Sequence, residues 1–134
     1  MSIVIHFDGS YKAQRGNCSC GGWISRNGQE IGQLRTTDIA CSSPVEAEYR
    51  ALIMMLILAD QMGFASGELE VRGDNQVCIS QMTNQVKCHD KKIKRLKGRA
   101  KLMASRFRHV NYIWVPRSEN TKADKIRSEE HTSE

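Results

Sequence analysis

The sequence is short of proline, aromatic residues and long apolar runs. Its 134 residues include 2 prolines, and 6% of them are aromatic. The longest apolar segment, residues 51–59, spans nine residues, which is about half of the roughly 18 that a membrane-spanning helix requires. The first segment turns polar at His6 and Asp8, which is not typical of a secretory signal. We therefore expect a cytoplasmic protein without a membrane-spanning segment.

Cysteine is present, but its spacing does not form a structural metal site. There are 5 cysteines, and no two of them have the CxxC spacing of a zinc site. Cys18 and Cys20 are separated by one residue, which indicates metal binding only weakly, because a structural zinc site needs four ligands in a recognisable pattern. Reduced, partly buried thiols are the expected state in the cytoplasm, and a single disulfide is the alternative.

The apolar content is high enough for a folded core. Hydrophobic residues make up 40% of the chain and charged residues 26%, with 10 glycines that follow no period. These values exclude a wholly disordered or collagen-like chain, and the length is typical of one domain. We expect a single monomeric domain over residues 1–127, followed by a polar, flexible tail over residues 128–134.

Positive charge is concentrated in one segment. The net charge is +5, and residues 87–108 contain ten basic residues and one acid, Asp90. The rest of the chain has ten basic and fourteen acidic residues. A basic stripe on a mildly acidic body indicates binding to a polyanion such as nucleic acid. The alternative is a solvated helix face that has no partner.

The first third of the chain predicts an antiparallel three-stranded meander. Residues 3–7 are apolar and rich in β-branched side chains, and the turn-forming segment 8–10 is expected to end this strand. Residues 21–25 and 30–36 have the character of strands. They flank an Asn-Gly pair at 27–28, which is a strong hairpin signal.

The remainder of the chain alternates helices and strands. Ser43, Pro44 and Glu46 form the signature of a helix N-terminus. Apolar residues at alternating spacings of three and four predict a basic amphipathic helix. The predicted elements are helix 44–62, strand 69–73, helix 76–82, basic helix 90–107, strand 110–115 and helix 119–127. Strand–helix–strand connections imply parallel pairing, so we predict an α/β fold with a five-stranded mixed sheet flanked by helices.

Acidic residues are expected to gather at one edge of this sheet. Asp8, Asp74 and Asp124 each follow a strand of its parallel part, and the carboxyl ends of such strands share the edge where ligands bind. On helix 44–62, a period of about 100° per residue places Glu48 on the buried side and Glu46 opposite. A buried carboxylate needs a partner or a metal. Oxygen-only ligands favour Mg²⁺ or Mn²⁺, and two such ions about 3.5–4 Å apart can promote phosphodiester cleavage.

Four pieces of the sequence together resemble a known family. They are Phe7-Asp8-Gly9-Ser10, Ala47-Glu48-Tyr49-Arg50-Ala51-Leu52, Gly73-Asp74-Asn75-Gln76 and the segment from Val115 to Asp124. Their order and spacing are similar to those of type 1 ribonuclease H, of the compact kind that also occurs as a domain of reverse transcriptases. The resemblance covers residues 7–124 and implies the ribonuclease H-like fold, which agrees with the predicted order of elements.

The resemblance also implies an activity and a set of functional residues. It implies an endonuclease that hydrolyses the RNA strand of RNA–DNA hybrids and leaves 3′-hydroxyl and 5′-phosphate ends. Two Mg²⁺ ions, or Mn²⁺ ions, would be held by Asp8, Glu48, Asp74 and Asp124. Glu48 would also sense the ribose 2′-hydroxyl. The implied minor-groove contacts are Gly9, Ser10, Asn75 and Gln76, and the phosphate contacts on the basic helix are Lys91, Lys92, Lys94 and Lys97.

The sequence departs from the family in three places. The loop before Asp124 lacks the histidine of many bacterial relatives, and Arg117 is the candidate catalytic substitute, with a phosphate contact or a surface ion pair as its alternative role. Ser43 and Pro44 replace the asparagines that often precede the catalytic helix, and the last helix is short. Two alternatives therefore stay open: a hybrid- or double-stranded-RNA-binding module with weak or no cleavage, and a DNA-cutting nuclease of the same fold.

Overall fold

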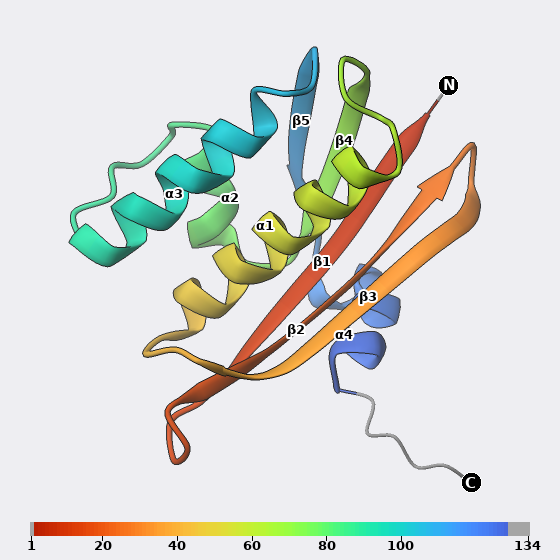
Figure 1. The fold of residues 1–134 in the computed structure, drawn as a ribbon. Helices are drawn as coiled ribbons and strands as arrows, with labels where there is room; N and C mark the ends of the chain where they lie inside the picture. Colours follow the sequence, from red (N-terminus) through yellow and green to blue (C-terminus); the bar gives the residue numbers. More distant parts are fainter. Residues whose placement is uncertain (1, 129–134) are drawn as a thin grey trace, which may run out of the picture.

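The computed structural model describes residues 2–128. Its elements are β1 (Ile3–Lys12), β2 (Asn17–Arg26), β3 (Gln29–Ala40), α1 (Pro44–Gln61), β4 (Glu68–Gly73), α2 (Gln76–Met82), α3 (Lys91–Ala104), β5 (His109–Trp114), the 3-10 turn η1 (Arg117–Glu119) and α4 (Thr121–Ser128). In this part of the chain, five strands form one sheet in the order β3-β2-β1-β4-β5 (Figure 1). The first three strands pair antiparallel, and β4 pairs parallel to both β1 and β5. The predicted fold class and strand pairing are confirmed.

The helices cover the sheet on both faces. α1 packs on β1 and on α3, whereas α4 packs on β2 and β1. Two neighbouring glycines of β2 show that these helices lie on opposite faces, because successive side chains on a strand point to opposite sides. A Cβ on Gly22 would meet Met55 of α1, and a Cβ on Gly21 would meet the backbone of Arg127 in α4.

The first strand is longer than the sequence predicted. The segment 8–10 does not end it, because β2 continues to pair with β1 as far as Lys12, which is opposite Asn17. The turn comes after this point, where the Gly16 N–H donates to the Lys12 carbonyl at 3.0 Å. Pairing between β1 and β4 ends earlier, at His6. Asp8 therefore lies within β1, at the place where the strand leaves β4.

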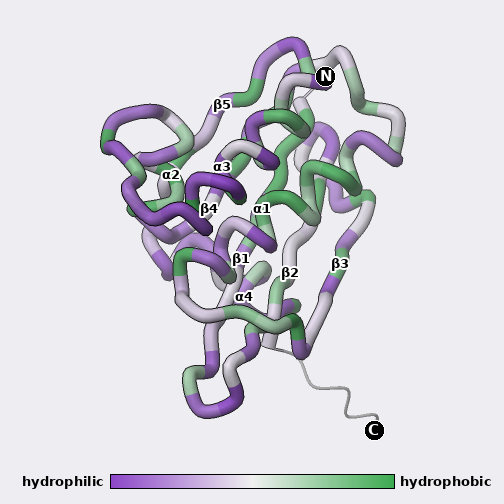
Figure 2. The backbone as a smooth tube through the Cα atoms, turned by 60° about the vertical axis from the view of Figure 1, so that its left-hand side comes forward, coloured by the Kyte–Doolittle hydropathy of each residue, from purple (hydrophilic) through white to green (hydrophobic). Residues whose placement is uncertain are grey.

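The predicted hairpin and the first helix are confirmed. Asn27 and Gly28 both have positive φ angles, 52° and 85°, as a type I′ turn requires. Ser43 caps α1, and its side chain accepts a hydrogen bond from the backbone N–H of Glu46. Figure 2 shows hydrophobic residues running along α1, whose inner face is buried in the core.

The basic helix is shorter than the predicted range of 90–107. Asp90 is its N-cap, and α3 ends at Ala104. The apolar stripe predicted for this helix consists of Ile93, Leu96, Ala100, Met103 and Phe107. Met103 is partly buried and the other four are buried, with Phe107 beyond the helix end. Most of the other residues of α3 are hydrophilic, and the helix is mainly purple in Figure 2.

The last helix begins later than predicted. Residues 117–119 form η1, and α4 starts at Thr121 after Asn120. Ser128, the first residue of the predicted tail, is the last residue of α4, and the remaining predicted tail residues, 129–134, lie outside the described part of the chain. No helix within residues 2–128 is both long and apolar enough to cross a membrane.

Candidate active site

Three carboxylates from three separate elements converge at the edge where β1 leaves β4. Asp8 lies in β1, Glu48 in the second turn of α1, and Asp74 directly after β4. One oxygen atom from each of them lies within 4.8 Å of the other two. Parallel pairing explains why Asp8 and Asp74 share this edge, and the predicted helical phase explains why Glu48 faces them.

Gly9 allows α1 to approach this edge closely. A Cβ at this position would overlap the carbonyl group of Ala47 and lie 2.8 Å from the backbone nitrogen of Glu48. Any side chain here would therefore push the first turns of α1 away from β1. The predicted role of Gly9 was a substrate contact, and the structure adds a packing role to it.

The carboxyl group of Glu48 is buried without full hydrogen bonding. The residue is 5% exposed, and its Oε1 atom has no hydrogen-bond partner among the described residues. Burial, followed by the negative charges of Asp8 and Asp74, raises the pKa of Glu48 well above its ordinary value. A buried acceptor that faces two like charges is costly. A divalent cation would remove this cost, so these three residues fit such an ion.

Asp8 is perturbed in the same direction. Burial raises its pKa, hydrogen bonding from Arg127 lowers it, and the charge of Asp74 raises it again, so that the pKa of Asp8 is about 6. Nε of Arg127 donates to Oδ2 of Asp8 at 2.7 Å. The guanidinium group therefore neutralises part of the negative charge that the three acids create.

Asp124 lies beside the three acids but not among them. It is on α4, and its side chain is 46% exposed. Its carboxylate pairs with the same Arg127 that binds Asp8. Of the four predicted metal ligands, the structure thus brings three together and connects the fourth to them through an arginine.

Three residues near the acids were missed by the sequence interpretation. Arg127 was assigned to the end of a helix, and its spacing of three from Asp124 was the one available signal of a contact. Nδ2 of Asn120 donates to the Phe7 carbonyl at 2.9 Å and contacts Oδ2 of Asp74 at 3.5 Å. The indole N–H of Trp114 donates to the Asp74 carbonyl at 3.0 Å. The last two contacts hold Asp74 against β1 and β5.

The predicted minor-groove residues lie around the same edge. Ser10 follows Gly9 in β1 and is partly buried. Asn75 is the N-cap of α2, and its side-chain oxygen accepts from the Cys78 N–H at 2.8 Å. Gln76 is exposed in the first turn of α2, and Arg117 is exposed in η1. Asn75 therefore has a structural role in addition to the predicted one.

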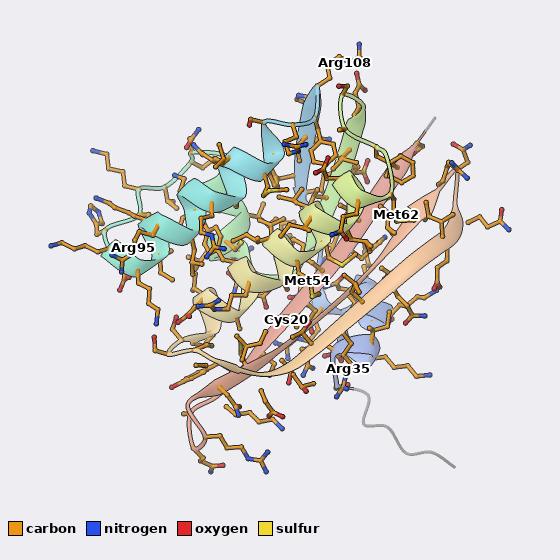
Figure 3. All side chains as sticks on the ribbon, in the orientation of Figure 1. Cys20, Arg35, Met54, Met62, Arg95 and Arg108 are labelled. Carbon is orange, nitrogen blue, oxygen red and sulfur yellow. The ribbon has the colours of Figure 1, made fainter. Side chains whose placement is uncertain are left out.

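The predicted phosphate-binding lysines lie on α3 but do not have equivalent surroundings. Lys91 and Lys94 are exposed, and Lys97 is partly buried. None of these three forms an ion pair with a described residue, whereas Lys92 contacts Glu46 of α1 at 3.2 Å. Figure 3 shows the side chain of Arg95 extending from α3 into the surroundings. The free positive charge of the helix therefore comes from residues other than Lys92.

The predicted state of the cysteines is confirmed in part. All five are free and buried. Within residues 2–128, the only group of three potential ligands that could share a metal ion is the one formed by Asp8, Glu48 and Asp74. The weak indication of a metal site at Cys18 and Cys20 is therefore not supported.

Comparison with known proteins identifies the family. The family described as reverse transcriptase-like matches residues 6–129. The chain belongs to this family. This membership, together with relatives and solved structures that are named ribonuclease HI and RNase H1, confirms the resemblance to type 1 ribonuclease H.

Relatives with curated names are found in mycobacteria and in an archaeon. The chain is 30% identical over 131 residues to the bifunctional protein Rv2228c of Mycobacterium tuberculosis, with 96% of this chain and 35% of that protein covered. It is 29% identical to ribonuclease HI of Halobacterium salinarum, with 95% and 63% covered. The chain thus spans about a third of the mycobacterial relative's length.

Solved structures share the fold of this reverse transcriptase-like chain. The N-terminal RNase H domain of Rv2228c from M. tuberculosis has 30% identity and a TM-score of 0.86, with 94% of this chain and 90% of that one covered. RNase H1 of H. salinarum has 29% identity and a TM-score of 0.88, with 96% of each chain covered. LC11-RNase H1, described in complex with an RNA/DNA hybrid, has 24% identity and a TM-score of 0.86, with 93% of each covered.

Proposed function

We propose that this chain is an endonuclease that hydrolyses the RNA strand of RNA–DNA hybrids. The observation that carries the proposal is the convergence of Asp8, Glu48 and Asp74 at the ligand edge of this fold, where one buried oxygen of Glu48 has no hydrogen-bond partner within residues 2–128. Relatives named ribonuclease HI and RNase H1 support the same activity.

The four acids divide into a central group of three and Asp124, which pairs with Arg127. Asp8, Glu48 and Asp74 would hold the divalent cations, Mg²⁺ or Mn²⁺, and Asp124 would join them when Arg127 releases it. Two bound ions would activate a water molecule and stabilise the leaving oxygen, so that the products carry 3′-hydroxyl and 5′-phosphate ends. Asp8 lies within 4.8 Å of both Glu48 and Asp74 and accepts a hydrogen bond from Arg127, so it would connect the metal-holding group with the Arg127–Asp124 pair.

The residues around the acids would recognise the hybrid. Ser10 and Gln76 follow Asp8 and Asp74 by two residues each and would contact the minor groove, and Glu48 would contact the ribose 2′-hydroxyl. The exposed cations of α3 would contact phosphates without regard to base sequence. Arg117 is exposed in the turn before α4, where it would contact a phosphate or assist in product release. A monomeric state and a cytoplasmic location stay predictions.

A strand-labelled hybrid tests the proposal directly. The RNA and DNA strands carry different labels, and the hybrid is incubated with the full chain in Mg²⁺, in Mn²⁺ and in EDTA. We expect cleavage of the RNA strand alone, and its loss in EDTA and in the Asp74→Asn variant. Asp38→Asn is the matched control, because Asp38 is exposed on β3 and is not part of the acidic group.

The same experiment distinguishes the alternatives. Binding of the hybrid without cleavage in either metal would refute the proposal and indicate a binding module. Cuts in the DNA strand would indicate a different nuclease of this fold. Cleavage that persists in Asp74→Asn would show that another site, or a contaminating nuclease, is responsible.

A further inference from the structure

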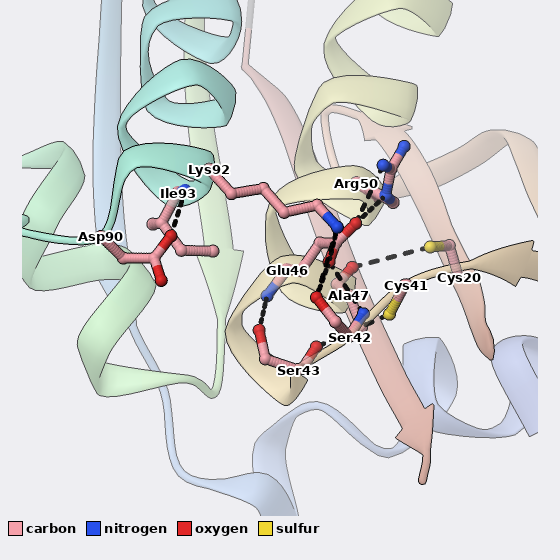
Figure 4. Close-up of polar contacts among 10 residues, drawn as sticks. All are labelled: Cys20, Cys41, Ser42, Ser43, Glu46, Ala47, Arg50, Asp90, Lys92 and Ile93. Atoms are coloured by element: carbon pink, nitrogen blue, oxygen red, sulfur yellow. Dashed lines mark hydrogen bonds and ion pairs between the residues drawn. The ribbon is translucent and has the colours of Figure 1, made fainter. Parts of the chain in front are cut away.

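Two glutamates of α1 lie two residues apart and face in different directions. Glu48 faces the acidic edge, whereas Glu46 faces α3 and is completely buried, with 0% exposure. The sequence interpretation placed Glu46 opposite the buried side and explained it as a capping residue. Its contact with Arg50 agrees with that placement, but its burial and its contact with α3 were not expected (Figure 4).

Glu46 accepts more hydrogen bonds than a cap requires. Its Oε1 atom accepts from the Ser42 N–H at 2.8 Å and the Ser42 hydroxyl at 3.0 Å, and Lys92 Nζ lies 3.2 Å away. Its Oε2 atom accepts from Nε of Arg50 at 2.9 Å. Burial alone would raise the pKa of Glu46, but these donors lower it to about 2. Two of these donors, Arg50 and Lys92, are cations, as an ionised carboxylate requires.

These contacts connect the N-termini of two helices that have separate roles. Lys92 lies in the first turn of α3, and Ser42 and Glu46 lie at the start of α1. Lys92 Nζ also contacts the Ser42 hydroxyl at 3.2 Å, so it touches both residues at that end of α1. α3 carries Lys91, Lys94 and Lys97, which form no ion pair inside the described range 2–128, and α1 carries Glu48. The Glu46–Lys92 contact is thus a charged connection between the basic surface and the acidic edge.

We propose that Glu46 is a positioning residue that holds α3 at a fixed distance from the carboxylates, so that a bound hybrid presents one defined phosphodiester bond to them. This inference rests on the proposed function. Capping of α1 alone would need the Ser42 and Ser43 contacts and no cation from α3. Burying a carboxylate and two cations costs desolvation free energy. What this arrangement adds beyond a helix cap is a contact between α1 and α3.

Positioning and simple electrostatics predict different outcomes for the Glu46→Gln variant. Glutamine has the same shape but leaves Arg50 and Lys92 without a counter-charge, so the surface becomes more positive. If only charge mattered, the hybrid would bind more tightly and be cut at the same place. If Glu46 positions α3, kcat falls while KM does not rise, and cuts spread to neighbouring bonds.

The experiment maps cut positions on an end-labelled hybrid of fixed length, using the full chain. We expect the Glu46→Gln variant to lower kcat by about tenfold, a modest loss for misplaced groups, and to replace a dominant cut by several adjacent ones. The Lys92→Gln variant removes the same contact from the other helix and should give the same spread. The double variant should add little, since both changes remove one interaction. Glu68→Gln is the control, because it removes an exposed ion pair with Arg108.

Stability measurements separate positioning from misfolding. Urea denaturation with and without Mg²⁺ shows whether each variant folds and whether the acidic edge still responds to the ion. Should Glu46→Gln fail to fold, the Lys92→Gln variant decides the inference by its cut pattern. A single unchanged cut position with wild-type kcat in a folded variant would overturn the inference and leave the proposed function intact. Absence of cleavage by the wild-type chain would overturn both.

Discussion

The Asp8→Asn substitution should stabilise the metal-free protein at neutral pH, although it removes a residue of the proposed active site. Burial, offset in part by hydrogen bonding from Arg127 and increased by the charge of Asp74, raises the pKa of Asp8 from 3.8 to about 6. At 1.36 kcal/mol for each pKa unit, an ionised Asp8 costs the folded state ~3 kcal/mol. Asparagine has the same shape and no charge, so the midpoint of thermal unfolding should rise by roughly 10 °C.

The stabilisation should depend on pH in a defined direction. Between 3.8 and about 6, the unfolded chain releases the Asp8 proton while the folded chain keeps it. The free energy of unfolding of the wild type therefore falls as pH rises through this range. Above the range Asp8 is ionised in both states, and the destabilisation has reached its full value. The difference between the variant and the wild type should be near zero at about pH 3 and reach ~3 kcal/mol above about pH 7.

His6 makes this difference more informative than the wild-type profile alone. Burial, followed by the charge of Arg72, lowers the pKa of His6 from 6.5 to about 4. Stability that depends on neutral His6 is present above 6.5 and is lost as pH falls toward 4, which opposes the effect of Asp8. Because both proteins contain His6, its contribution cancels when the variant is compared with the wild type.

The assay is urea denaturation in EDTA at a series of pH values, repeated with Mg²⁺. The wild type should gain stability from Mg²⁺ because the ion binds only the folded state, and Asp8→Asn should gain much less. Asp38→Asn is the control for an exposed aspartate and should match the wild type. A variant that is no more stable than the wild type at neutral pH, or a difference that does not change with pH, would refute the reasoning about Asp8.

Three further outcomes are expected. Gly9→Ala should destabilise the protein by about 3 kcal/mol, because its Cβ would overlap the Ala47 carbonyl; an unchanged urea midpoint would show that α1 can shift. The double variant Lys94→Gln, Lys97→Gln should bind the hybrid with a weaker salt dependence: the slope of log binding constant against log salt concentration should become less steep by about 2. An unchanged slope in filter-binding titrations would mean that α3 is only a solubilising surface. Arg127→Ala should bind Mg²⁺ about tenfold more tightly, equivalent to ~1.4 kcal/mol, since no guanidinium group then competes at Asp8; equal affinities in calorimetry would contradict this.

Features that depend on a few neighbouring residues could be predicted from the sequence. The cap at Ser43 and the hairpin at Asn27-Gly28 are local, because each requires a particular backbone geometry within one turn. The inward orientation of Glu48 followed from helical period alone. The shared edge of Asp8 and Asp74 followed from parallel pairing, although β1 extends beyond the predicted turn. These features were sufficient to bring three of the four predicted acids together.

Features that depend on distant residues could not be predicted in the same way. Arg127 contacts Asp8 across 119 positions of the chain, and Asn120 contacts the Phe7 carbonyl across 113 positions. Neither contact leaves a periodic pattern in the sequence. The end of β1 was also misplaced for this reason, because pairing with β2 outweighs the turn preference of the segment 8–10.

Glu46 and Glu48 show why burial of an acid does not by itself indicate function. Both are buried on the same helix, yet partners lower the pKa of Glu46 to about 2, while burial and like charges raise the pKa of Glu48 well above its ordinary value. The difference is the number of donors: Glu46 is surrounded by cations and N–H groups, and Glu48 has an oxygen with no partner among the described residues. A satisfied buried carboxylate stabilises an arrangement of the chain. An unsatisfied one beside two like charges lowers stability until a cation binds, so it is Glu48 that indicates a site for an external ion.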